Sequence, residues 1–292
     1  MKRLLGLFLI SILATGCGDA NSRYIRSAIR IMDMNGLYAV GPEWEKAKQE
    51  ALAARPSSPE EAQEVIATAG KVAGGKHTFL LTEDKVSENA SAESEMPAVE
   101  LLEDGINVIK LPPFSGNAQE GINYARTVLN AVTDDIQGVV IDLRGNRGGN
   151  MYPMIAAVHR FLPDDVILRF RTRRNNMPIN LDYATRSAGI DRQPAIDCPV
   201  ALLTDDLTGS SGEAVLLCFR GLERCRTFGA PTAGYASSNQ PYPLPDGSQL
   251  VLTIGEDIAR TGEAFCEDPI APDVPTDKPF EAALEWLKAY KR

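Results

Sequence analysis

Two short stretches of the chain combine residue types that can carry out chemistry. Residues 138–149 have the pattern of a buried strand that runs into a loop with adjacent glycines, and residues 207–214 place serines where a buried strand gives way to a helix. A glycine-rich loop can aim backbone N–H groups at an anion. A serine at a helix start lies near unpaired backbone N–H groups and the positive end of the helix. Enzymes that transfer acyl groups combine such a nucleophile with such N–H donors, so these features together predict a serine hydrolase.

Each stretch alone also has a plainer explanation. Ser210 or Ser211 could simply cap the helix, with Glu213 in its first turn, and residues 207–214 taken alone favour capping. A tight turn would account for the glycines of the first loop. Phosphate binding is disfavoured there, because the loop has neither a P-loop lysine nor a spaced dinucleotide fingerprint.

A nucleophilic serine needs a neighbouring base, and the chain has only two histidines. His159 lies inside a helical stretch and is expected to be a packed or surface residue. His77 follows a Gly-Gly-Lys loop at the start of a strand, where a side chain can be aimed into a cleft. If the base is a histidine, His77 is the expected one.

The elements that must position these residues alternate between apolar strands and helices, which predicts an α/β core. Strands are expected at 78–81, 106–111, 139–143, 166–170, 200–203, 227–229 and 250–253, and core helices at 120–132, 152–162, 213–219 and 281–290. The strand at 139–143 is apolar except for Asp142, so its sheet should be covered on both faces. Segment 83–95 is expected to be a loop, and the locally basic run 169–176 a solvated loop or flap. Residues 22–73 should form a small N-terminal helical unit before a core of 74–292.

Length and composition set wider limits. The chain has 292 residues, of which 44% are hydrophobic and 24% charged, as in a folded protein with a sizeable core. Its formal net charge of -9 argues against general nucleic-acid binding, which requires basic surfaces.

The N-terminus has the pattern of an export signal. Lys2 and Arg3 precede an apolar stretch at 4–13, which is too short to span a bilayer comfortably. Small residues then lead to Cys17, so residues 1–17 resemble a bacterial lipoprotein signal with Cys17 as the lipid-modified residue. An ordinary cleaved signal is the alternative. Both predict an exported protein of the bacterial cell envelope, and a lipid on Cys17 would anchor it in the periplasm.

Four further cysteines follow, at positions 198, 218, 225 and 266. An oxidising compartment would permit two disulfides, in any of three pairings, and buried thiols are an equally open alternative. A zinc site is disfavoured, because no close pair of cysteines lies near a histidine.

The chain resembles the tail-specific, or C-terminal-processing, serine peptidases, most of all the branch of the tricorn core and the nisin-resistance proteins. Five motifs carry the resemblance, in the family's order, within the stretch from His77 to Val274. They are Asp-Leu-Arg-x-Asn-x-Gly-Gly at 142–149, the serine motif at 208–213, Gly-x-x-Thr-x-Gly at 229–234, the hairpin at 244–248 and Ile-Ala-Pro-Asp-Val at 270–274. The resemblance implies the ClpP/crotonase-like α/β core of the tail-specific protease domain.

The resemblance also implies roles for single residues. Ser210 becomes the nucleophile, because it is the serine three positions before the acid Glu213, and this overrides the capping interpretation. The N–H of Ser211 and one from Gly148 or Gly149 would form the oxyanion hole.

The chain departs from many family members at the base. They use a lysine directly after Gly-x-x-Thr-x-Gly, where this chain has Tyr235, and a tyrosine with a pKa near ~10 is a poor base at neutral pH. Residues 75–78 match the histidine loop of the other branch, so the resemblance assigns His77 as the base, with Thr78 supporting its orientation. Glu267 is the nearest fit to that branch's downstream acid.

These residues predict an exported serine endopeptidase that cleaves peptides or unfolded protein tails through a Ser–His dyad and an acyl-enzyme, without metal or cofactor. Too few residues separate His77 from the strand at 106 for the PDZ domain of many relatives. Substrate capture would then rely on the helical unit, the core cleft and segment 171–186, with an extended peptide added to a strand edge. A non-catalytic protein that binds a peptide or hydrophobic ligand on the same fold is the alternative. The branch suggests a cationic antimicrobial peptide as substrate, and general envelope proteolysis is equally open.

Overall fold

The computed structural model describes residues 15–91 and 94–290. They form two compact units. The helical unit extends to Glu83 and includes residues 241–252, and the core unit comprises residues 84–240 and 253–292. The expected signal at 1–17 lies largely in residues 1–14, outside the described residues, and the first helix begins at Thr15.

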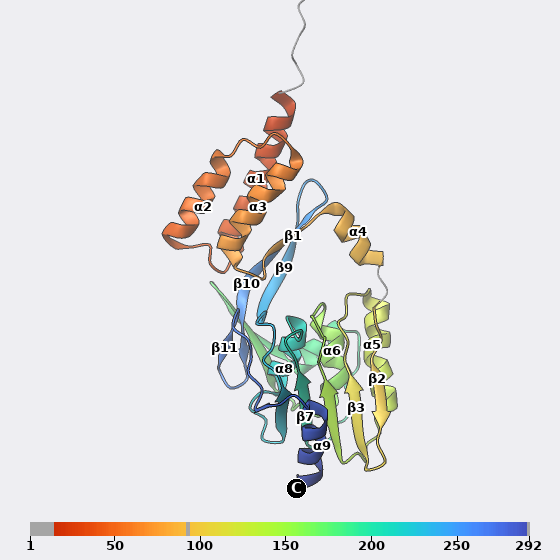
Figure 1. Cartoon of the computed structure of the whole chain (residues 1–292). Helices are drawn as coiled ribbons and strands as arrows, with labels where there is room; N and C mark the ends of the chain where they lie inside the picture. The colour runs from red at the N-terminus through yellow and green to blue at the C-terminus, as the bar shows by residue number, and fades with distance from the viewer. Residues whose placement is uncertain (1–14, 92–93, 291–292) are drawn as a thin grey trace, which may run out of the picture. The chain divides into compact units, whose positions relative to one another are not determined.

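Three helices build the helical unit, and they pack on one another (Figure 1). They are α1 (Thr15–Asn35), α2 (Gly41–Ala53) and α3 (Pro59–Gly74). Ala28 and Met32, four residues apart on α1, are fully buried, as is Ile66 of α3. Ser58 caps α3 by accepting the N–H of Glu61 at 3.2 Å, which confirms the helix start expected there.

A short strand completes this unit. β1 (Phe79–Leu81) follows the Gly-Gly-Lys loop and pairs antiparallel with residues 249–251 of β10 (Gln249–Ala259). β10 and its neighbour β9 (Ser237–Pro243) each contribute residues to both units.

A largely parallel sheet forms the centre of the core unit. Its strand order is β12-β8-β7-β4-β3-β2, and every neighbouring pair is parallel except β2 with β3. The strands are β2 (Ala98–Leu101), β3 (Ile106–Lys110), β4 (Gly138–Asp142), β7 (Val200–Thr204), β8 (Cys225–Gly229) and β12 (Val274–Pro275). All five residues of β7 are buried, as expected for a sheet covered on both faces.

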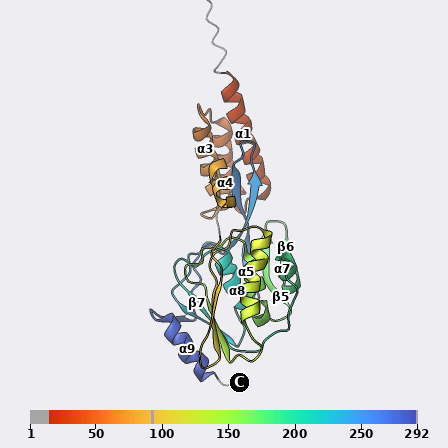
Figure 2. The same cartoon turned by 90° about the vertical axis from the view of Figure 1, so that its right-hand side faces the viewer.

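Helices cover this sheet on its two faces (Figure 2). Val139 and Ile141 of β4 belong to a core with α5, α6 and α8, whereas Val140, which points the other way, packs with α9. The helices are α5 (Ala118–Ala131), α6 (Met151–Val158), α8 (Ser211–Phe219) and α9 (Pro279–Ala289). The mixed α/β class and the N-terminal helices predicted from the sequence are confirmed.

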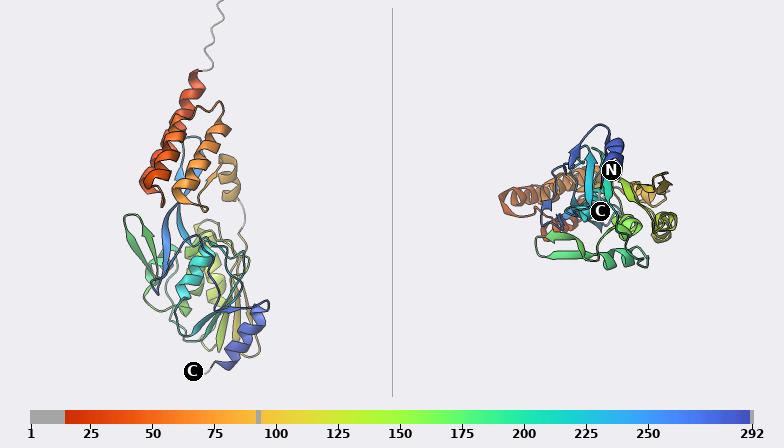
Figure 3. Two further views of the ribbon diagram at one scale, coloured as in Figure 1. Left: turned by 60° about the vertical axis from the view of Figure 1, so that its left-hand side comes forward. Right: turned by 90° about the horizontal axis from the view of Figure 1, so that it is seen from below.

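A second sheet contains β5, β6, β9, β10, β11 and β1. Its remaining strands are β5 (Val166–Thr172), β6 (Asn176–Asn180) and β11 (Ala264–Phe265). Helix α7 (Leu181–Ser187) follows β6. The solvated loop or flap expected at 169–176 is a loop only at 173–175, because residues 169–172 belong to β5 and residue 176 begins β6 of a β-hairpin (Figure 3). The sequence shows Arg171 as part of a basic run, whereas the fold places it opposite Glu256 of β10, with an ion pair of 2.6 Å.

The loop expected at 83–95 is also wrong, because Glu83–Ser91 forms helix α4. Acids at its first two positions favour a helix N-terminus, and Lys85 and Glu88 form an i,i+3 ion pair of 3.0 Å. A short 3-10 helix, η1 (His159–Phe161), follows α6.

The described part of the chain also bears on the cysteines, metals and membranes. No disulfide joins its cysteines, and burial raises the pKa of the Cys225 thiol to about 12. No three His, Cys, Asp or Glu side chains within it are grouped to hold a metal ion. Within residues 15–91 and 94–290, no helix combines the length and apolarity needed to span a membrane.

Candidate active site

The two candidate loops meet because the strands before them are neighbours. β4 and β7 pair in parallel, with Asp142 opposite Leu203, so both strands end at the same edge of the sheet. The loop after β4 carries the glycines and the loop after β7 carries the serines. Ligands of α/β sheets commonly bind outside the carboxyl ends of such strands.

Ser210 has a strained backbone. Its φ of 52° and ψ of −116° make it the one non-glycine residue with positive φ in the described part of the chain. Helix-capping residues normally have an extended backbone. A non-glycine residue in such a conformation costs about 1–3 kcal/mol and is typical of functional sites, including the sharp strand-to-helix turns that expose nucleophilic serines. The conformation therefore favours a nucleophile over a simple cap.

Glu213 holds this strained turn in place. Its buried carboxylate accepts hydrogen bonds from the N–H groups of Ser210 (2.8 Å), Gly234 (2.9 Å) and Tyr235 (2.8 Å) and from the hydroxyl of Thr232 (2.5 Å). Burial raises the pKa of Glu213, and these hydrogen bonds act in the opposite direction. The carboxylate thus ties the start of α8 to the loop after β8.

The glycines allow the first loop to approach Ser210 closely. Gly148 and Gly149 have φ values of 105° and 112°, which side chains rarely adopt. A Cβ on Gly148 would lie 2.7 Å from the Cβ of Ser210, and one on Gly149 would lie 1.9 Å from the carbonyl oxygen of Phe114. Neither position can hold a larger residue without moving the backbone.

The hydrogen bonds distinguish the two glycines as oxyanion donors. The N–H of Gly148 already donates to Oδ1 of Asn146 at 2.9 Å. Among the described residues, the N–H groups of Gly149 and Ser211 have no acceptor. The hydroxyl of Ser211 donates to the carbonyl of Gly149 at 2.5 Å, which links the two loops at this point. Gly149 and Ser211 line the same pocket as Ser210, so this pocket holds two backbone donors that could receive an oxyanion.

Asn146 is a site residue whose role the sequence did not reveal. It is fully buried, and its Nδ2 donates to the carbonyl of Leu111 at 2.8 Å while its Oδ1 accepts from Gly148. Its own carbonyl accepts the N–H of Gly209 at 2.9 Å, so one residue connects both loops and the end of β3. Its position in the motif at 142–149 was the one sequence signal that could have singled out this residue. Its hydrogen-bond partners could not be predicted, because they depend on the fold.

A pocket of about 400 Å³ opens beside Ser210 within the core unit. Ser210, Ser211 and Gly149 form one part of its wall. Apolar and aromatic side chains line much of the rest, namely Met151, Tyr152, Phe170, Met177, Tyr183, Ala214 and Ile254. The volume suits a peptide side chain, and its position next to the unpaired N–H groups suits a substrate carbonyl.

The predicted base lies in the other unit. His77 is half-buried, and burial, followed by the charges of Lys76 and Lys71, lowers its pKa to about 4. Thr78 beside it is buried, and its N–H donates to the carbonyl of Gly75 at 3.2 Å. The pairing of His77 with Ser210, and the support from Thr78, stay predictions.

The other histidine is packed, as expected. His159 is buried, its Nδ1 lies 2.7 Å from the carbonyl of Ala156, and its Nε2 accepts the N–H of Gln193 at 2.9 Å. Glu267 is half-buried, and its backbone carbonyl abuts Gly234 in the loop that Glu213 holds. Its proposed support of catalysis stays a prediction.

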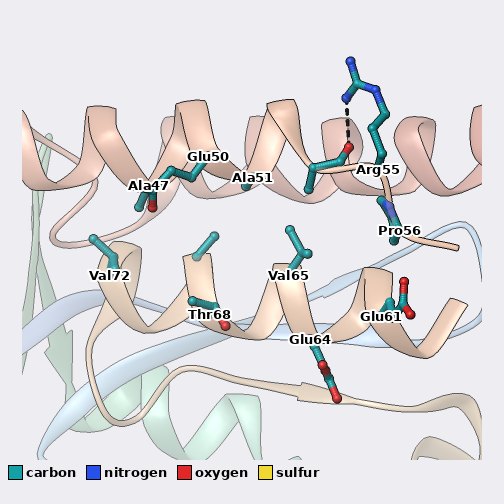
Figure 4. Close-up of a pocket in the computed structure, with 12 residues that line it drawn as sticks. Ala47, Glu50, Ala51, Arg55, Pro56, Glu61, Glu64, Val65, Thr68 and Val72 are labelled. Atoms are coloured by element: carbon teal, nitrogen blue, oxygen red, sulfur yellow. Dashed lines mark hydrogen bonds between the residues drawn. The ribbon is translucent and has the colours of Figure 1, made fainter. Parts of the chain in front are cut away.

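A second pocket, of about 550 Å³, lies between α2 and α3 of the helical unit (Figure 4). Alanine, valine and glutamate side chains contribute most of its lining, and neither serine nor histidine is among the lining residues. The candidate nucleophile Ser210 and the candidate oxyanion donors Gly149 and Ser211 all belong to the core unit.

Replacement of Glu213 by glutamine should weaken both the fold and the site. The amide keeps one acceptor oxygen but turns an NH₂ group toward backbone N–H donors, and each unsatisfied buried group costs about 1–3 kcal/mol. We expect Glu213→Gln to lower the free energy of unfolding in urea by about that amount and to slow the reaction of Ser210 with a fluorophosphonate. The exposed Glu223→Gln is the matched control. Unchanged stability in Glu213→Gln would contradict the role given to this carboxylate.

Comparison with known proteins places this site in a family. Residues 105–276 match peptidase family S41. The chain is 32% identical to the nisin-resistance protein of Lactococcus lactis subsp. lactis, over 91% of this chain and 87% of that protein. It is 28% identical to the chloroplastic carboxyl-terminal-processing peptidase 2 of Arabidopsis thaliana, over 72% of this chain but only 40% of that longer protein.

A solved structure agrees over nearly the whole chain. A lipoprotein from Streptococcus agalactiae superposes with a TM-score of 0.86 at 29% identity, covering 98% of this chain and 99% of that one. The family match covers both loops of the candidate site and the pocket beside them. The chain belongs to peptidase family S41.

Proposed function

We propose that this protein is an exported serine endopeptidase with Ser210 as nucleophile and His77 as base. One observation carries the proposal most directly: Ser210 has a strained backbone and shares a pocket with the N–H groups of Gly149 and Ser211, which have no acceptor among the described residues. Membership of a peptidase family supports peptide bonds as the target. The five ordered sequence motifs support the same residues.

The proposed reaction follows from the chemistry of these groups. His77 accepts the proton of the Ser210 hydroxyl, and Oγ attacks the carbonyl carbon of a peptide bond. The N–H groups of Gly149 and Ser211 stabilise the oxyanion, at about 3 kcal/mol for each donor. His77 then protonates the leaving amine, and water hydrolyses the acyl-enzyme to release Ser210.

The environment of His77 supports its role as a base. A base must be neutral before the reaction, and burial with two neighbouring lysines holds the pKa of His77 at about 4. The imidazole is therefore neutral at physiological pH. The loop around it is fixed by a hydrogen bond from Lys71 to the carbonyl of Lys76, 2.9 Å long.

The substrate and location are proposed from the sequence and the relatives. The nisin-resistance protein aligns with most of this chain, and its name refers to nisin, a peptide. We therefore propose a peptide substrate for this protein. The structural relative described as a lipoprotein supports a lipid anchor on Cys17. We place the protein at the bacterial cell envelope, on the periplasmic side, with its anchor in the membrane.

Loss of either member of the dyad should abolish the reaction. We expect Ser210→Ala and His77→Ala to eliminate cleavage of an unfolded protein substrate and labelling by a fluorophosphonate, while circular dichroism stays that of the wild type. The exposed Ser187→Ala is the control and should label normally. Full activity in either dyad variant would remove that residue from the mechanism, and absence of labelling in the wild type would favour the non-catalytic binding protein.

The acid limb of the pH profile, where kcat/KM falls as the pH is lowered, should lie at an unusually low pH. Because His77 must be neutral to accept a proton and its pKa is lowered to about 4, kcat/KM should fall as the pH drops through about 4 and not near 6.5. Lys76→Met removes a positive charge that disfavours the protonated imidazole, so this variant should shift the limb upward. Lys46→Met, a change at an exposed lysine of α2, should not. A limb that stays in place in Lys76→Met would contradict the assignment.

A further inference from the structure

A buried acid that the proposed reaction does not use lies in the core unit. Asp257 of β10 is 2% exposed, and its Oδ1 has no hydrogen-bond partner among the described residues. The preceding residue, Glu256, points to the opposite face of the strand and forms an ion pair with Arg171. Buried carboxyls are normally hydrogen-bonded or paired with a cation, so the unsatisfied oxygen of Asp257 needs an explanation.

Asp257 lines the pocket that contains Ser210, and so does a second unsatisfied oxygen. The hydroxyl Oγ of Ser238 is buried without a hydrogen-bond partner in the described part of the chain. A Cβ built on Gly255 would lie 2.7 Å from this oxygen. Gly255 lies two positions before Asp257, on the same face of β10, so Ser238 and Asp257 share one side of the strand.

The charged group that acts on the pKa of Asp257 is itself an acid, so it cannot satisfy the free oxygen. Glu213 is the charged neighbour that acts on it, and its own carboxylate is saturated by four donors. Burial, and then the charge of Glu213, raise the pKa of Asp257 well above its usual range. Burial, and then the charge of Asp257, raise the pKa of the Cys218 thiol on α8, and the charge of Arg260 acts in the opposite direction. This part of the pocket therefore favours a positive charge that a ligand brings.

We propose that Asp257 and Ser238 select a lysine or arginine side chain in the substrate, at a residue that flanks the scissile bond. The inference rests on the proposed function, since it names the substrate class of the same pocket. Ser210 and Gly149 at the pocket wall put the scissile carbonyl there, and the aromatic and apolar wall suits the aliphatic stem of a long basic side chain. The N–H donors of this basic side chain would then hydrogen-bond to Oδ1 of Asp257 and Oγ of Ser238, the oxygens described above.

Matched peptides test this selection. Two peptide libraries should be compared, identical except that lysine in one is norleucine in the other, with cleavage sites mapped by mass spectrometry. We expect cuts to be flanked by lysine and kcat/KM to favour the lysine peptide. Asp257→Asn, which keeps the shape and removes the charge, should lower the ratio of lysine to norleucine kcat/KM by roughly tenfold or more. Glu256→Gln removes the adjacent charge on the opposite face and should leave that ratio unchanged.

The outcomes separate the two proposals. Equal losses for both peptides in Asp257→Asn, or cuts without a flanking basic residue, would overturn the selection while fluorophosphonate labelling of Ser210 still supported the peptidase. Absence of both labelling and cleavage in the wild type would instead overturn the proposed function, and the selection with it. Retention of lysine preference in Asp257→Asn would assign the preference to another group and contradict the role of Asp257.

Discussion

The site depends on one buried carboxylate with four hydrogen bonds. Glu213 accepts the N–H of Ser210 and three donors from the loop after β8, so it joins two loops that are far apart in sequence. A strained residue persists only when its surroundings over-determine it. Here the strain at Ser210 is balanced by a charge that would be costly to leave unpaired in the interior. The turn at Ser210 and the fold of the core unit therefore stabilise each other.

The glycine loop depends on a second connection of the same kind. The side chain of Asn146 accepts a hydrogen bond from the N–H of Gly148, and its backbone carbonyl accepts one from the N–H of Gly209. These bonds fix the glycine loop against the serine loop. Because Gly148 is used in this way, the N–H of Gly149 is the one left to bind an anion. One asparagine thus both shapes the loop and determines which of the two glycine N–H groups is left without an acceptor among the described residues.

Much of this arrangement could be predicted from the sequence, because it depends on local patterns. Apolar strands that end in functional loops identified the α/β core, and the motifs at 142–149 and 208–213 identified the residues that the fold brings together. The choice between Gly148 and Gly149 could not be predicted, since it depends on which N–H the side chain of Asn146 takes. The β5–β6 hairpin was missed because Arg171 is stabilised by Glu256, which lies far away in sequence. Asp257 carries no local signal, because its surroundings come from distant segments.

We propose that Ser210 attacks a carbonyl whose oxygen accepts hydrogen bonds from the N–H groups of Gly149 and Ser211. The most direct measurement is a crystal structure of the protein with a peptide boronic acid, which forms a tetrahedral adduct with a nucleophilic serine. We expect boron to be bonded to Oγ of Ser210, with one boron oxygen hydrogen-bonded to the N–H groups of Gly149 and Ser211 and the N–H of Gly148 still donated to Asn146. Boron bonded to another residue, or a boron oxygen bound by Gly148 in place of Gly149, would contradict it.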